Sequence, residues 1–182
     1  VPGRTSCDML PDTIARLAAH PKVAAVKEAT GSLARAQQVI AACPDDFDVL
    51  SGDDFTCMGM TALGGNGVIS VVSNLVPGDT ARMIKAVHEG DMARARELHY
   101  KLEPLMHLLF VEANPIPVKA GVSLLGYTAN EVRLPLLPLG AAKRAILNAE
   151  LESLGEVSSP GRPAPGARGA WAPPRPLPAP PP

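Results

Sequence analysis

One local pattern recurs four times in the first 90 residues. An apolar run ends, a short polar turn follows, and a segment with apolar residues at helical spacing begins. The four apolar runs end near residues 2, 27, 50 and 72, at intervals of 22 to 25 residues. Intervals of this size are typical of consecutive β-α units. The pattern therefore predicts an α/β protein.

The apolar runs do not alternate between apolar and polar residues. Runs of this kind predict parallel strands covered on both faces. Three whole strands are expected, at 22–27, 47–50 and 68–72. The segments after the four runs predict helices near 10–20, 32–42, 54–63 and 79–88. Each of them should begin at a Ser, Thr or Asp that accepts a bond from a free backbone N–H group.

After residue 90 the pattern changes to helices alone. Apolar residues at helical spacing predict one long helix at 91–111 and two shorter helices at 117–125 and 139–154. The expected organisation is a β/α part at 1–90, followed by a helical part at 91–157. A body of 157 residues is about one domain on a length prior of roughly 150 residues per domain.

The remaining 25 residues, 158–182, differ in composition. They hold ten of the 20 prolines and three arginines, and no Asp or Glu, which predicts a disordered tail. Arg175 precedes prolines at 178 and 181, a spacing that suits a polyproline helix docking in an SH3-like groove. A non-catalytic interaction protein that uses this tail is therefore one alternative, although such matches are common in Pro-dense segments.

Composition also limits the partners and the compartment. The sequence has no window of 18 consecutive apolar residues, so no membrane-spanning helix is predicted. A net charge of −1 gives no reason to expect nucleic acid as a partner. The start lacks both a secretory signal and an initiator Met, so we expect a processed chain or part of a longer one. Three widely spaced cysteines, at 7, 43 and 57, favour the reducing cytoplasm.

Lys27 is the most informative side chain. It closes an apolar strand, and strand parity places it on one face with Val23 and Ala25. Proteins with α/β folds keep their sites at the carboxyl ends of the strands. A lysine that loses hydration there has a lowered pKa, so more free amine is available to attack a carbonyl. From position alone, a surface lysine paired with Glu28 is the stronger interpretation.

Two other motifs have structural interpretations. The glycine-rich GGNG at 64–67 could be a phosphate-binding loop. A turn is favoured instead, because the segment lies between a helix and the next strand and lacks the P-loop Lys. Asp53 and Asp54 could be acid/base or metal carboxylates, but Asp directly before a helix is usually a cap.

A third set has metal-ligand spacing. His99, Glu103 and His107 lie four apart on one helix face. Pro104 interrupts that face and no third histidine follows, so a solvated face is favoured and no metal site is predicted.

Five short sequence motifs occur one after another along the chain. They are VPGRT at 1–5, VKEATG at 26–31, LSGDD at 50–54, GGNGVIS at 64–70 and NPIPVK at 114–119. Together they resemble the dihydrodipicolinate synthase family, one of the pyruvate-dependent class I aldolases and lyases. The resemblance covers about residues 1–155.

The resemblance implies roles for four residues. Lys27 is expected to form a Schiff base with pyruvate, and the resulting enamine to attack aspartate semialdehyde, with no metal or diffusible cofactor. Arg4 is expected to meet a substrate carboxylate, which suits a guanidinium. Gly52 is expected to keep the pocket open. The backbone of Ile69 is expected to contact bound pyruvate, whereas its residue type alone indicates a core position.

The resemblance also implies an architecture. It is the C-terminal portion of a TIM (β/α)8 barrel, with the last three strands and the tip of the fifth in 1–90, followed by a helical cap. A whole barrel takes about 250 residues, and the full-length family is expected to be a homotetramer. The family's catalytic tyrosine falls before Val1, and Tyr100 and Tyr127 lie in the helical part. We therefore expect a C-terminal fragment that does not catalyse alone. N-acetylneuraminate lyase or 2-keto-3-deoxy sugar-acid aldolase chemistry stays open as an alternative.

Overall fold

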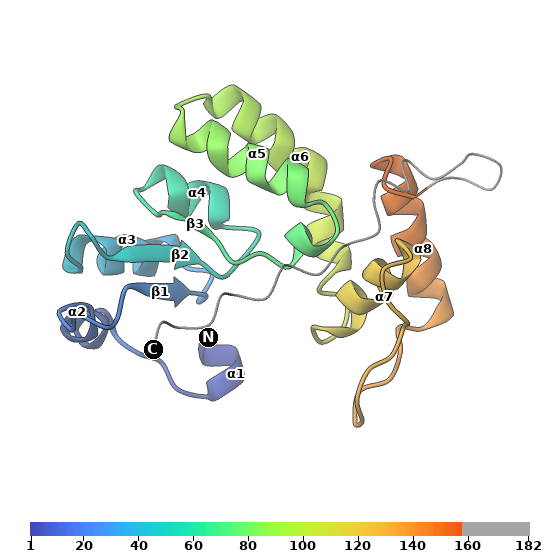
Figure 1. Cartoon of the computed structure of the whole chain (residues 1–182), viewed down its shortest axis with the longest axis horizontal. Helices are drawn as coiled ribbons and strands as arrows, with labels where there is room; N and C mark the ends of the chain where they lie inside the picture. Colours follow the sequence, from blue (N-terminus) through green and yellow to red (C-terminus); the bar gives the residue numbers. More distant parts are fainter. Residues whose placement is uncertain (158–182) are drawn as a thin grey trace, which may run out of the picture.

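The centre of the molecule is a small parallel sheet. The structure is a computed structural model that describes residues 1–157. Its strands are β1 (Ala25–Glu28), β2 (Asp48–Ser51) and β3 (Gly67–Val68), in the order β1-β2-β3 (Figure 1). In the register of the sheet, Lys27 lies beside Leu50, and Leu50 beside Gly67. The predicted α/β class and the three strands are confirmed within the described residues.

The helices that cover one face of the sheet include one that precedes the first strand and others that follow each strand. They are α2 (Pro11–Ala18), α3 (Leu33–Ala42), α4 (Cys57–Ala62) and α5 (Pro77–His88). Apolar side chains of α2, α3 and α4 pack with Val49 of β2 in one core cluster that includes Ile14, Val39 and Met60. Val49 and Ser51 are buried on this face, as is Glu28 of β1. The helices therefore bury the strand positions that alternate with Lys27.

The opposite face of the sheet is open in the described part of the chain. Ala25 and Lys27 are exposed, and so is Ile69, just beyond β3. Strands covered on both faces would belong to a whole barrel, and the three strands expected from part of one leave this face uncovered within residues 1–157. The uninterrupted apolar runs identified the strands, but they did not indicate which face of the sheet the helices cover.

Two predicted strand segments have other structures. Val1-Pro2, expected as the tip of a strand, leads into the single helical turn α1 (Pro2–Thr5), since a proline suits the first position of a helix. The third strand ends at Val68 rather than at Val72, and the one-turn helix η1 (Val72–Asn74) follows. The cause is Asp54, whose carboxylate accepts bonds from the backbone N–H groups of Val71 and Val72.

One of the expected helix caps is confirmed at Ser32, which accepts a bond from the Arg35 backbone N–H at the start of α3. Asp91 caps α6 in the same way by accepting a bond from the Arg94 backbone N–H, although no cap was predicted there. The expectation is wrong for α2 and α5, which begin at Pro11 and Pro77. The fixed φ of proline suits the first turn, and the missing N–H would have had no helical partner there.

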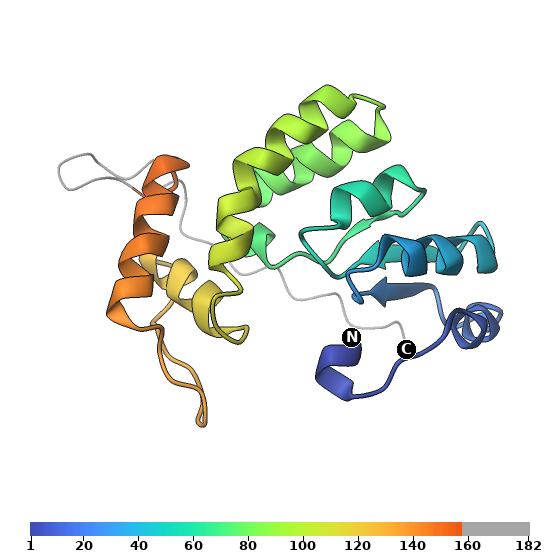
Figure 2. The ribbon, with the colours of Figure 1, turned by 180° about the vertical axis from the view of Figure 1, so that it is seen from behind.

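The helical part consists of α6 (Met92–Leu108), α7 (Ile116–Leu124) and α8 (Ala141–Ser153) (Figure 2). The α6 helix continues through Pro104, which was expected to interrupt its face. These helices share the largest core cluster with Val72, Leu75 and Val76, so η1 packs with the helical part. No helix of the described residues is both long and apolar enough to cross a membrane. The predictions for the tail at 158–182 and for Arg175 lie outside the described residues.

Candidate functional site

Lys27 lies near the carboxyl end of β1, on the open face of the sheet. Its side chain is exposed, so the loss of hydration expected from the sequence does not occur within residues 1–157. The expected pairing with Glu28 is absent too, because the two side chains alternate across the strand. Glu28 is buried on the helix-covered face and accepts a bond from the Thr30 backbone N–H at 2.5 Å.

Gly52 leaves room for the stem of Lys27. A Cβ placed on Gly52 would lie 2.5 Å from Cε of Lys27 and 2.6 Å from Cβ of Ala29. Real Cβ atoms essentially never approach other heavy atoms so closely. The backbone at position 52 therefore forms a wall against which the lysine stem lies, and only glycine fits there without a shift of its neighbours.

A cavity of about 270 Å³ lies beside Lys27. Its walls come from the first turn of the chain, from the loop before α2 and from the end of β1. The residues that line it include Pro2, Thr5, Cys7, Met9, Lys27 and Ala29. A small molecule that reacts with the lysine amine would thus lie against the segment that carries Arg4.

Arg4 and the NPIPVK segment meet, although 110 residues separate them. The Nη2 atom of Arg4 donates to the backbone carbonyl oxygen of Asn114 at 3.3 Å. This contact joins α1 to the turn before α7, and sequence reasoning did not predict it. The only indication of this contact in the sequence is that both motifs belong to the family resemblance. A guanidinium group has five N–H donors, so others remain for a carboxylate.

Ile69 follows β3 at the same edge of the sheet. Its backbone N–H donates to the carbonyl oxygen of Ser51 at 2.7 Å, which continues the ladder beyond the strand. Its side chain is 47% exposed, so the core position indicated by residue type alone is wrong. Lys27, Gly52 and Ile69 therefore belong to three adjacent segments on one side of the sheet.

Both Asp53 and Asp54 accept bonds from backbone N–H groups, but only Asp53 does so at the helix that follows, so the predicted cap is wrong for Asp54. The Asp53 carboxylate accepts bonds from the backbone N–H and the hydroxyl of Thr56, at the start of α4. The Asp54 carboxylate accepts from Val71 and Val72, at 2.9 and 3.2 Å, and so holds the turn after β3. Burial raises the pKa of Asp54, and the hydrogen bonds to its carboxylate oppose that rise in part.

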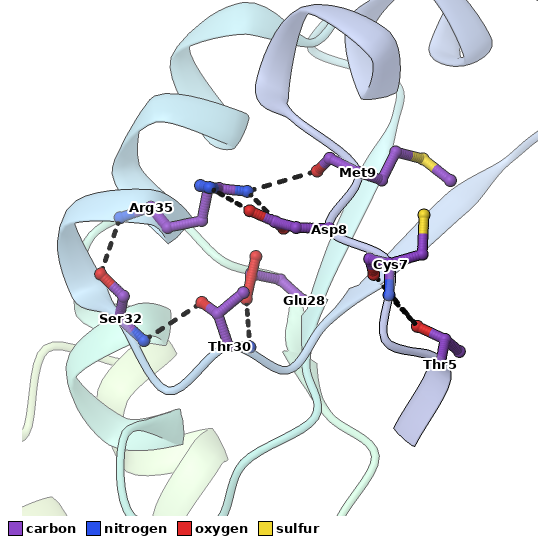
Figure 3. A network of polar contacts seen from close by, with 8 residues as sticks. All are labelled: Thr5, Cys7, Asp8, Met9, Glu28, Thr30, Ser32 and Arg35. Carbon is purple, nitrogen blue, oxygen red and sulfur yellow. Dashed lines mark hydrogen bonds and ion pairs between the residues drawn. The ribbon is translucent and has the colours of Figure 1, made fainter. Parts of the chain in front are cut away.

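The loop after β1 is held by a chain of polar contacts that the sequence did not reveal (Figure 3). The Glu28 carboxylate binds the Thr30 backbone, and the Thr30 hydroxyl accepts from the backbone N–H of Ser32. Ser32 caps α3 at Arg35, whose guanidinium donates to both carboxylate oxygens of Asp8 at 2.9 and 2.8 Å. The contacts connect the end of the Lys27 strand to the loop before α2.

The other candidates have structural roles. The GGNG segment is the turn between α4 and β3, as predicted, and Asn66 bonds the backbone of Val49 through both its own backbone and its side chain. His107 pairs with Glu103 at 2.7 Å, and its ring lies on Phe55. Among residues 1–157, no group of three or more His, Cys, Asp or Glu side chains is placed to hold a metal ion.

Comparison with known proteins gives one consistent family. The sequence profile of the Dihydrodipicolinate synthetase family matches residues 1–154. The 4-hydroxy-tetrahydrodipicolinate synthase of Pelobacter propionicus is 52% identical over 157 residues, which cover 86% of this chain and 54% of that relative. The chain thus spans about half the length of the curated relatives it matches.

Solved structures agree with this comparison. Dihydrodipicolinate synthase from Thermotoga maritima matches with a TM-score of 0.83 and 41% identity, over 86% of this chain and 55% of that one. The Acinetobacter baumannii enzyme, complexed with pyruvate, matches with a TM-score of 0.82 and 37% identity, over 86% and 54%. These matches agree with the β/α arrangement of the described residues. The chain belongs to the dihydrodipicolinate synthetase family.

Proposed function

We propose that the protein to which this chain belongs is a 4-hydroxy-tetrahydrodipicolinate synthase, and that Lys27 is its Schiff-base lysine. In this reaction of lysine and diaminopimelate biosynthesis, pyruvate condenses with aspartate semialdehyde. The observation that carries the proposal is the fit of the Lys27 stem against Gly52, at the carboxyl edge of the sheet. The names of the relatives support the choice of substrates.

The lysine amine can perform the first steps without a metal ion. Its Nζ attacks the C2 carbon of pyruvate, and the carbonyl oxygen leaves as water to give an iminium. The iminium withdraws electrons, so a methyl proton can leave and its bonding pair forms an enamine. The enamine carbon then attacks the aldehyde carbon of aspartate semialdehyde and forms the new carbon–carbon bond.

The other predicted residues take roles around this lysine. Arg4 pairs with a substrate carboxylate through donors that it does not use on Asn114. Gly52 leaves the space that the lysine stem needs. The backbone at Ile69 faces the bound pyruvate from the next strand. We further propose that the whole protein is a cytoplasmic homotetramer, which analytical ultracentrifugation of that protein would test.

Borohydride trapping tests the role of Lys27. The whole protein to which this chain belongs is incubated with pyruvate and borohydride, and the modified peptide is identified by mass spectrometry. We expect an adduct on Lys27, none on the nearby exposed Lys22, and loss of the adduct in Lys27→Arg. An adduct that spreads over several surface lysines, or none at Lys27 in a folded sample, would remove Lys27 from this role.

A further inference from the structure

The Arg4 segment, residues 1–9, makes few contacts that hold it in place. None of the residues of α1 is buried, and residues 6–10 are exposed as well. Within the described residues, hydrogen bonds join residues 1–9 to the rest of the chain only through two guanidinium groups. One is that of Arg4 itself, and the other is that of Arg35 on α3.

Arg35 makes three hydrogen bonds to this segment. Its two terminal nitrogens donate to the two carboxylate oxygens of Asp8, and Nη1 also donates to the carbonyl oxygen of Met9 at 3.3 Å. Two parallel bonds between a guanidinium and a carboxylate fix orientation as well as distance. The Arg35 side chain is 19% exposed and that of Asp8 is 42% exposed, so the pair lies at the protein surface without being fully solvated.

Arg35 is in turn connected to the strand that carries Lys27. Its backbone N–H bonds the Ser32 hydroxyl, and the Ser32 backbone bonds the Thr30 hydroxyl. The Thr30 backbone bonds the Glu28 carboxylate, next to Lys27 in sequence. Figure 3 shows these contacts as one continuous set around the loop after β1. Arg35 therefore joins the Lys27 strand to the Arg4 segment, and 23 residues separate Arg4 from Lys27 in sequence.

We propose that the Asp8–Arg35 pair positions the Arg4 segment against the carboxyl end of the Lys27 strand, and so sets where a substrate carboxylate binds. Arg35 is a positioning residue in this proposal, because its guanidinium acts through Asp8 and Met9 and not on the substrate. The inference rests on the proposed function for its substrate, but the geometry of the pair is independent of it.

The test compares Arg35→Ala, Asp8→Ala, the double variant and Arg35→Lys in the whole protein to which this chain belongs. Arg94→Ala is the matched control, because it removes another arginine–carboxylate pair, with Glu97, on α6. Amide hydrogen exchange of the peptide that spans residues 1–9 measures how firmly the segment is held. Borohydride trapping on Lys27 is measured against the concentration of pyruvate and, separately, of acetone, which has a carbonyl group but no carboxylate.

We expect exchange of residues 1–9 to rise severalfold in Arg35→Ala and Asp8→Ala, with no further rise in the double variant. The half-saturating pyruvate concentration should rise severalfold while the plateau rate of trapping stays the same. Trapping of acetone should not change. Arg35→Lys should lie between Arg35→Ala and the wild-type chain, because lysine keeps the charge but lacks the planar fork. Arg94→Ala should match the wild-type chain in all measurements.

Unchanged exchange in residues 1–9 would overturn the proposal. So would raised exchange with an unchanged pyruvate dependence, or a parallel loss of pyruvate and acetone trapping. A wild-type whole protein that traps neither compound would instead contradict the role of Lys27. In that case the substrate part of the inference falls with the proposed function, and the exchange data alone decide whether the pair holds the segment.

Discussion

Gly52 leaves the space in which Lys27, the proposed Schiff-base lysine, is positioned. We expect Gly52→Ala to displace Lys27, because the new Cβ would lie 2.5 Å from Cε of Lys27 and 2.6 Å from Cβ of Ala29. Misplacement of a reacting group by about 1 Å costs on the order of 100-fold in rate. The measurement is the rate of borohydride trapping of pyruvate on Lys27, which should fall by about that factor.

The control for this change is Gly3→Ala. Gly3 lies in α1 near the same cavity, and a Cβ added there would meet no heavy atom within 4 Å. Trapping should be unchanged in this variant. Equal rates in Gly52→Ala and the wild-type chain would show that the lysine does not depend on the open space at position 52.

Asp54 gives a pH dependence of stability with a defined sign. Burial raises the pKa of this carboxyl above 3.8, its ordinary value, although hydrogen bonds to it oppose the rise. The folded state therefore holds the proton more tightly than the unfolded state, and this contribution to stability is lost as the pH rises from about 4 through the folded pKa. The free energy of unfolding of the wild-type chain, minus that of Asp54→Asn, should fall over this range.

Urea denaturation at a series of pH values measures this difference. Asn keeps an oxygen that can accept the N–H bonds of Val71 and Val72, but it has no titrating proton in this range. The subtraction thus isolates the Asp54 carboxyl from the other carboxyls of the chain. A difference that is constant with pH, or one that rises, would contradict the raised pKa.

At the scale of the elements, α7 closely approaches Leu75, the residue directly after η1, at one glycine. A Cβ on Gly121 of α7 would lie 2.7 Å from Cδ1 of Leu75, a fully packed side chain that is 2% exposed. We expect Gly121→Ala to lower the free energy of unfolding by about 1–3 kcal/mol, the usual cost of overpacking a core. Urea unfolding followed by circular dichroism measures the change.

A double variant separates overpacking from other effects of the alanine. In Leu75→Ala the clashing methyl groups are gone, so adding Gly121→Ala to it should cost less than it does in the wild-type chain. Strictly additive free energies would mean that the two residues do not contact each other and that the cost of Gly121→Ala has another origin.

The elements themselves were largely predictable from the sequence, because each depends on local periodicity. The helices at 33–42 and 92–108 each begin within two residues of the predicted start, directly after a Ser or Asp cap. The end of the third strand was not predictable, since it depends on the Asp54 carboxylate, which lies 17 residues before Val71. The helical turn at Pro2–Thr5 was missed for a similar reason, because four residues are too few to show a period.

At the scale of the whole molecule, the largest core cluster joins η1 to α6, α7 and α8. Leu105 lies within it and is fully buried. We expect Leu105→Ala to lower the free energy of unfolding by about 2–5 kcal/mol, the range for removing a buried leucine side chain. The matched control is Ile146→Ala on α8, where the side chain is 56% exposed and the cost should be small. Urea unfolding compares the two, and equal costs would contradict this assignment of the core.

Three-dimensional relations at the candidate site were less predictable than its individual residues. The family resemblance of the five motifs predicted roles for Lys27, Arg4, Gly52 and Ile69. No local pattern indicated that Arg4 would reach the carbonyl oxygen of Asn114. The interpretation from position alone did give an exposed Lys27, but its pairing with Glu28 was wrong, because strand parity places the two side chains on opposite faces. The Asp8–Arg35 pair joins positions 27 residues apart and has no periodicity that could have revealed it.

The sheet has helices on one face, and Lys27 lies on the other. Substitutions along its strands should therefore separate into two groups that alternate with every residue. Changes at Val26, Val49 or Ser51 would alter how much folded protein a cell contains, whereas changes at Ala25, Lys27 or Leu50 would alter what each folded molecule does. In a saturation mutagenesis experiment that scores abundance and activity separately, the two scores should diverge with a period of two. Positions of the second group are then the ones to vary when new carbonyl substrates are sought.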